Sequence, residues 1–154
     1  MSGNKVILDS NVLILASKQQ IDLEKLLSGY DEIYVSIITF MEVYGFDFEN
    51  QPEKDLIDEM FSYLEIVDVN IQIAKQVVVY KKSKTRKIKL PDAIILATAQ
   101  YLGADLITDD WDDFMNIDDL VTIKNFYCKE LMNVAILHAL GDCTLPLSRL
   151  YKGL

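Results

Sequence analysis

Short apolar runs alternate along the chain with longer segments in which apolar residues recur at helical spacing. The short runs consist mainly of valine, isoleucine and leucine, and they predict β-strands at 6–8, 33–35, 66–69, 106–108 and 121–123. The first run contains no polar residue, which is typical of a strand that is covered on both faces of its sheet.

The longer segments predict helices between these strands. Residues 52–64 carry a clean apolar stripe, residues 70–82 repeat that pattern, and a shorter stripe covers residues 21–28. Residues 91–102 are apolar on nearly every face and precede Gly103, which predicts a buried helix that ends at this glycine. Strands that alternate with helices predict an α/β fold with a parallel sheet covered by helices on both faces.

Composition and charge narrow the class of protein. The chain has 154 residues, of which 51% are hydrophobic and 25% charged, the balance of a folded domain rather than of a disordered chain. No apolar run approaches the roughly 18 residues of a membrane span, and the first strand is followed at once by Asp9, unlike a signal peptide. The net charge of −9 argues against a general nucleic-acid coat or a basic membrane-surface protein. We therefore expect a cytoplasmic protein without membrane contact.

Carboxylates break the apolar pattern at four places. Asp9 directly follows the first strand, Glu42 lies in an apolar helical stretch just after the second strand, and Asp92 opens the buried helix. Asp109 and Asp110 follow the fourth strand. Because functional sites of parallel sheets form outside the carboxyl ends of the strands, these side chains are expected to meet at that edge.

Such a cluster calls for a cation, because neighbouring carboxylates raise one another's pKa unless a positive charge neutralises them. Carboxylate ligands suit Mg²⁺ or Mn²⁺, so the residues alone predict a divalent metal site. Simpler roles stay open for each acid. Asp9 could cap a helix that starts near Asn11, Glu42 could form a capping box with Thr39, and Asp92 could complement a helix dipole.

Four motifs, in this order, resemble those of the PIN domain family. They are residues 6–14 with Asp9, Glu42 behind Ser36 and Thr39, Leu90-Pro91-Asp92-Ala93, and residues 106–114 with Asp110 and Asp113. Over about residues 4–125, their order and spacing are similar to those of the VapC-type toxin ribonucleases of toxin–antitoxin pairs. The resemblance implies a three-layer α/β/α fold with a central parallel sheet of about five strands, in a nuclease domain at 1–125.

The same resemblance implies an endoribonuclease that depends on Mg²⁺ or Mn²⁺ and cleaves single-stranded RNA through a water activated by the metal. The catalytic acids would be Asp9, Glu42, Asp92 and Asp110, and the metal ligands Asp9, Asp92, Asp110 and Asp113. Ser10, Asn11 and Thr108 would fix the orientation of these carboxylates. A small antitoxin protein and a homodimer are also implied, and the sequence adds only the apolar stripes at 21–28 and 52–64 to support them.

A basic run precedes the helix that Asp92 opens. Six of the 15 basic residues fall within nine positions, and we expect Lys81, Lys82, Lys84, Arg86 and Lys87 to hold an RNA backbone, with Lys89 completing the run. The alternative is a solvated helix end that the helix dipole favours.

Residues 126–154 form a C-terminal extension to which the resemblance gives no role. Its apolar residues between 131 and 140 predict one more helix that packs on the domain or on a partner. Cys128 and Cys143 are too few for a disulfide framework, and their spacing from His138 matches no common zinc site.

Two other functions fit parts of the sequence. A PIN nuclease that acts in RNA maturation without an antitoxin would use the same acids. A phosphoacceptor signalling domain of flavodoxin-like topology would use Asp68 as the acceptor beside Asp9. Against that second function, Ser10 supplies no adjacent second acid, and Glu42 and Asp92 would have no role.

Overall fold

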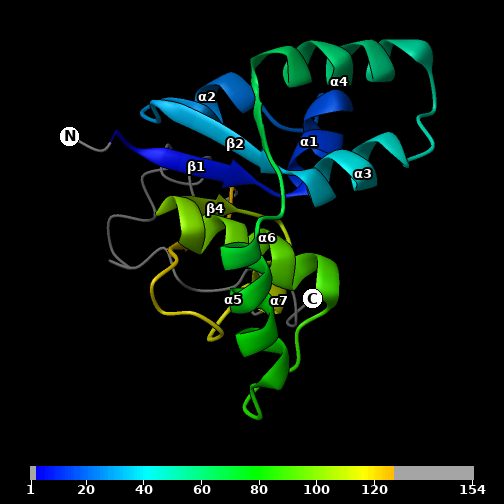
Figure 1. Ribbon diagram of the computed structural model, residues 1–154. Helices are drawn as coiled ribbons and strands as arrows, with labels where there is room; N and C mark the ends of the chain where they lie inside the picture. The colour runs from blue at the N-terminus through cyan, green and yellow to red at the C-terminus, as the bar shows by residue number, and fades with distance from the viewer. Residues whose placement is uncertain (1–2, 127–154) are drawn as a thin grey trace, which may run out of the picture.

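A parallel five-stranded sheet forms the middle layer of residues 3–126, the part of the chain that this computed structural model describes (Figure 1). The strands are β1 (Lys5–Leu8), β2 (Glu32–Ser36), β3 (Glu65–Val67), β4 (Asp105–Ile107) and β5 (Ile123–Lys124). They pair in the order β3-β2-β1-β4-β5, and every pairing is parallel. The chain adds β2 and β3 on one side of β1 before it places β4 and β5 on the other side, so β1 is central.

Helices fill the connections between these strands. They are α1 (Ser10–Ser17), α2 (Leu23–Leu27), α3 (Ile37–Tyr44), α4 (Gln51–Tyr63), α5 (Ile71–Lys82), α6 (Leu90–Leu102) and α7 (Trp111–Phe114). Side chains that accept a backbone N–H start the first five of them: Asp9 for α1, Asp22 for α2, Ser36 for α3, Asn50 for α4 and Asn70 for α5. Helix α6 ends as predicted at Gly103, which adopts a left-handed conformation with φ of 64°.

The two faces of the sheet bury separate cores. Val6 and Leu8 of β1 lie in one core, with Ile57 of α4 and residues of α1, α2 and α3. Ile7 lies in the other core with Leu96 of α6 and residues of α5 and α7. All of these named side chains are fully buried, and Figure 1 shows α4 above the sheet and α5, α6 and α7 below it. The predicted three-layer α/β/α fold is confirmed.

The predicted helices at 52–64, 70–82 and 91–102 agree with α4, α5 and α6 to within one residue. The third and fifth strands are shifted from their predicted positions. Strand β3 stops at Val67 because its neighbour β2 ends at the residue paired with it. Val121, which was predicted to open the fifth strand, instead packs into the core that contains Ile7 and Leu96, and β5 starts at Ile123.

The strand order places the site and removes one alternative. Strands β1 and β4 are neighbours although β2 and β3 intervene in the sequence, so the order reverses there, and ligands of open α/β sheets bind outside the carboxyl ends at such a point. Flavodoxin-like proteins have the order 2-1-3-4-5 instead. Asp68 follows β3 at the edge of the sheet, with β2 between β3 and β1. The observed strand order therefore contradicts the flavodoxin-like topology that the phosphoacceptor hypothesis requires.

The described residues end at Phe126, and the domain boundary at 125 stays a prediction. Phe126 is buried in the core that contains Val6 and Leu8. The predicted helix between 131 and 140 lies outside the described residues. No helix within residues 3–126 has the length and apolar character needed to cross a membrane.

Truncation of Leu96 tests the packing of α6. We expect Leu96→Ala to lower the free energy of unfolding by about 2–5 kcal/mol, because it leaves a cavity in a core with no exposed surface. Val79→Ala on α5, where the side chain is 59% exposed, should change it by less than about 0.5 kcal/mol. Urea unfolding measures both values, and equal effects would contradict the assignment of Leu96 to the core.

Candidate functional site

Asp9 occupies the carboxyl end of β1 and is buried, with 5% of its surface exposed. Its backbone N–H donates to the carbonyl oxygen of Ile107 at the end of β4, at 3.0 Å, so the two strand ends are joined at this residue. Its Oδ1 accepts from the Ser10 N–H at 2.7 Å, which makes Asp9 the cap of α1. Its Oδ2 accepts from the Thr108 hydroxyl at 2.8 Å. The capping role that stayed open is therefore real, and the second oxygen has a different partner.

Thr108 and Asn11 connect Asp9 to the acids behind β4. The Thr108 hydroxyl accepts from the Asp110 N–H at 3.0 Å while it donates to Asp9. The Asn11 amide donates to Asp110 Oδ2 and accepts from the Asp109 N–H, both at 3.2 Å. Together these bonds fix the turn after β4 against the start of α1, and they hold Asp110 beside Asp9.

Glu42 and Asp92 come from two further elements. Glu42 is an exposed residue of α3, and Asp92 is a half-buried residue in the first turn of α6. The capping box of Thr39 and Glu42 is wrong, because α3 begins earlier, at Ile37, behind the Ser36 hydroxyl. The buried Thr39 hydroxyl instead donates to the carbonyl oxygen of Leu8, at 3.4 Å. This bond ties α3 to the strand end that presents Asp9.

Electrostatics show that these acids form one group. Burial raises the pKa of Asp9 to about 6, and repulsion by Glu42 and Asp92 adds to the rise, although the Thr108 and Ser10 hydrogen bonds oppose it. Burial also raises the pKa of Asp92, which the Lys89 charge lowers and which repulsion by Asp113, Glu42 and Asp110 raises further. The four segments that the sequence singled out therefore place their acids within electrostatic reach of one another.

The donor set suits a hard divalent cation. All the candidate ligands are carboxylates, and residues 3–126 contain neither a histidine nor a cysteine. Within these residues, no three acids stand close enough together to enclose an ion by themselves. A cation would relieve the mutual repulsion that raises the pKa values of Asp9 and Asp92. The chemistry of the residues present thus fits Mg²⁺ or Mn²⁺.

Two side chains of the basic run donate hydrogen bonds to backbone carbonyls. Lys81 donates to the carbonyl oxygen of Ile88 and Arg86 to that of Met115, both at 2.8 Å. Lys82, Lys84 and Lys87 are exposed. Two of the five residues predicted to hold RNA therefore also stabilise the connection before α6 and the loop after α7.

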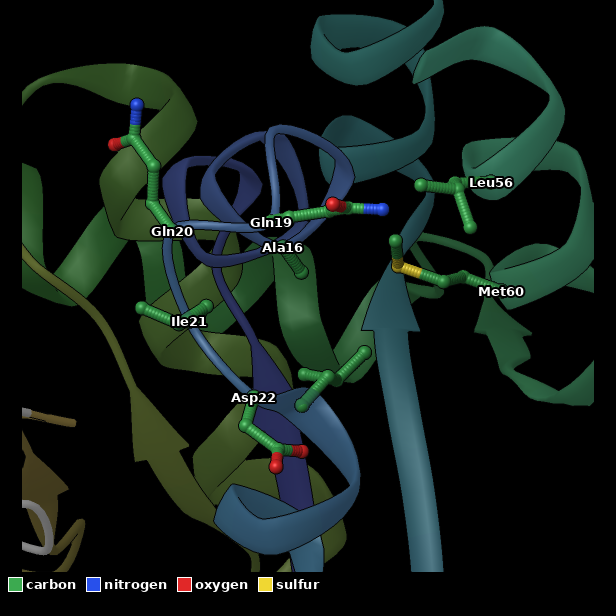
Figure 2. A pocket seen from close by; sticks show the side chains of 8 residues that line it. Ala16, Gln19, Gln20, Ile21, Asp22, Leu56 and Met60 are labelled. Carbon is green, nitrogen blue, oxygen red and sulfur yellow. The ribbon is translucent and has the colours of Figure 1, made fainter. Parts of the chain in front are cut away.

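A groove lies at the C-terminal end of α1, between that end and α4, whereas Asp9 caps the N-terminal end of the same helix. It has a volume of about 420 Å³ and is lined by Ala16, Gln19, Gln20, Ile21, Asp22, Leu23, Leu56 and Met60. Figure 2 shows Leu56 and Met60, from α4, facing the Ala16–Gln19 side of the groove. Four of these residues, Ile21, Leu23, Leu56 and Met60, belong to the apolar stripes predicted at 21–28 and 52–64. Their joining into one groove follows from the packing of α1 against α4 and was not predicted.

Comparison with known proteins identifies the family. The family model of the PIN domain matches residues 6–120, which include all the acids described above. The chain therefore belongs to the PIN domain family.

Individual proteins are also similar to this chain in sequence or in structure. The chain is 26% identical over 146 residues to Ribonuclease VapC2 of Methanocaldococcus jannaschii. This match covers 80% of this chain and 96% of that protein. Its structure is similar to a chain in the crystal structure of VapBC2 from Rickettsia felis bound to a DNA fragment from their promoter, with a TM-score of 0.66, 22% identity, and coverage of 79% and 98%. A chain of a toxin–antitoxin complex from Klebsiella pneumoniae is 28% identical with a TM-score of 0.57, and the match covers 76% and 95% of the two chains.

Replacement of Asp9 tests the electrostatic cost of the site. Because folding raises the pKa of Asp9 from 3.8 to about 6, the protonated carboxyl stabilises the fold below about pH 4, and this contribution is lost as the pH rises through 6. The side chain of Asp9→Asn stays neutral. In chelator at about pH 7.5, we expect the variant to be more stable than the wild type by up to roughly 3 kcal/mol, and the difference should shrink toward pH 4.

Urea unfolding at several pH values measures this difference. Asp112→Asn, at an exposed position of α7, is the matched control and should show no comparable gain. A wild type that is at least as stable as Asp9→Asn near pH 7.5 would contradict the predicted cost.

Proposed function

We propose that this protein is an endoribonuclease that depends on Mg²⁺ or Mn²⁺, cleaves single-stranded RNA in the cytoplasm and acts as the toxin of a toxin–antitoxin pair. The observation that carries the proposal is the buried Asp9 carboxylate, held by Thr108 and Ser10 and repelled by Glu42 and Asp92. Such an arrangement costs folding energy and is typical of sites that hold a cation. The PIN domain match and the ribonuclease relative support the reaction class.

Each acid has a proposed role. Asp9, Asp92 and Asp110 hold the cation, and Asp113 joins them from the next helical turn, while Glu42 binds the cation or orients water beside it. A bound divalent ion lowers the pKa of water and stabilises negative charge on a phosphate. Ser10, Asn11 and Thr108 fix the carboxylate orientations through the hydrogen bonds described above. We place Asp110 before Asp113 as the fourth acid, because Thr108 links Asp110 directly to Asp9.

The basic run supports a nucleic-acid substrate. A chain with a net charge of −9 repels RNA over most of its surface, so cations beside the acids are needed to hold the backbone. We assign this role to the run of Lys81, Lys82, Lys84, Arg86 and Lys87. Lys82, Lys84 and Lys87 are its most accessible members, since Lys81 and Arg86 also donate to backbone carbonyls.

The groove supports a protein partner. The solved structures described above are toxin–antitoxin complexes, and we propose that a small antitoxin lays apolar side chains into the groove between α1 and α4. We also propose a homodimer. Exposed apolar side chains of α5, namely Ile71, Val78 and Val79, are available for it.

The central test is cleavage of defined single-stranded RNAs. We expect Asp9→Asn to reduce cleavage in Mg²⁺ or Mn²⁺ by on the order of 1,000-fold, because it removes a charge that holds the cation without changing the shape of the side chain. Wild-type protein in excess chelator should be equally inactive. Gel analysis of the products, with circular dichroism to verify folding, measures this effect.

Asp68→Asn provides the matched control, since this exposed carboxylate follows the edge strand β3 and should retain full activity. Unchanged cleavage by Asp9→Asn, or by wild type in chelator, would refute the metal mechanism.

The partner is tested with a charge placed in the groove. In an Asp9→Asn background, which permits expression, Met60→Glu should abolish co-purification of a small protein encoded beside this gene, because apolar side chains of the partner would bury the new carboxylate without a counter-charge. Tyr63→Glu changes a residue of the same helix that is 77% exposed, and the partner should be retained. Light scattering of the complex gives its mass and hence the number of copies of this chain. No small protein bound to the Asp9→Asn protein from its native host would argue for an RNA-maturation role instead.

A further inference from the structure

Lys89, the last residue of the basic run, lies next to the acids. It is the last residue before α6, and 79% of its side chain is exposed. Its ammonium lies 3.5 Å from Oδ2 of Asp113, and its charge lowers the pKa of Asp92. Among the ion pairs of residues 3–126, this one joins a lysine to an acid of the site.

Two other side chains of the basic run are placed differently. Lys81 and Arg86 are held by the carbonyl oxygens of Ile88 and Met115, so their use by a ligand would disturb the loops that they brace. Within residues 3–126, the Lys89 ammonium donates to no backbone carbonyl in this way. Its partner is a carboxylate that is itself 47% exposed. An ion pair as exposed as this one contributes about 0–1 kcal/mol, so it separates easily.

We propose that Lys89 binds a phosphate of the RNA backbone at the entrance to the acids, and that it exchanges Asp113 for this phosphate when RNA arrives. A phosphate approaching this edge meets Asp92, Asp110 and Asp113, and Lys89 supplies the positive charge that lies among them. Lysine is suited to this exchange because its ammonium is a point charge on a flexible stem. Release of Asp113 leaves that carboxylate available to the cation of the site. The inference rests on the proposed function and names a contact that positions its substrate.

A merely structural role makes a different prediction. If Lys89 only screens the charge of Asp113, then its removal weakens RNA binding by exposing Asp113, and the effect must vanish once Asp113 is neutral. If Lys89 binds phosphate directly, then the effect persists without Asp113. A double-mutant cycle of Lys89→Gln and Asp113→Asn separates the two roles.

Binding of a short labelled single-stranded RNA of mixed sequence, measured by fluorescence anisotropy in chelator, provides the readout without cleavage. We expect Lys89→Gln to weaken binding about fivefold at about 0.1 M salt and to reduce the slope of log K against log salt by about 0.7, the value for one lost phosphate contact. The same change in slope should occur in the Asp113→Asn background. Lys89→Arg should retain the wild-type slope, because it keeps the positive charge.

Lys54→Gln is the matched control, since Lys54 forms an exposed ion pair with Asp58 on α4, away from the acids. It removes the same net charge and should leave affinity and slope unchanged. A Lys89→Gln effect that disappears in the Asp113→Asn background, or an unchanged slope, would overturn the proposal while wild-type cleavage leaves the ribonuclease assignment standing. Wild-type protein that neither binds nor cleaves the RNA would refute both.

Discussion

The structure depends on the burial of one carboxylate at the end of an apolar strand. Asp9 continues the run of Val6, Ile7 and Leu8, which are fully buried, so its side chain emerges where little water reaches it. Three contacts make this position tolerable: the Ser10 N–H, the Thr108 hydroxyl and the bond from its own N–H to Ile107. The first lies at the start of α1, and the other two lie at the end of β4. The hydrogen bonds that satisfy Asp9 therefore assemble the site around it.

The sequence was sufficient for the layers and for the acids. Helices such as α6 were predictable because their apolar periodicity and their terminal glycine are local signals, and Asp9 was predictable because a charge directly after an apolar strand is conspicuous. The ends of β3 and β5 were not predictable, because a strand ends where its neighbour ends, and that is a property of the sheet. Val121 packs into the core that contains Ile7, and this apolar side chain made residues 121–123 look like a strand.

The candidate site, like the fold, was predictable from the sequence only in part. The acids stood out by their positions along the chain, and the resemblance to a family implied the residues that hydrogen-bond to them. What each basic residue does could not be named, because Lys81, Arg86 and Lys89 look equivalent in sequence. Only the fold brings Arg86 to the Met115 carbonyl and Lys89 to Asp113. The sequence showed two apolar stripes that contribute to the groove. It did not show that they face each other, because that packing joins residues about forty positions apart.

Helix α1 has one further consequence. Asp9 caps its first turn, while Ala16 in its last turn lines the groove. A helix of eight residues is about 12 Å long. An extended peptide advances about 3.3 Å per residue, so an arm of roughly four residues would bridge the two ends of α1. The separation between the groove and the Asp9 carboxylate is thus set by the length of one short helix.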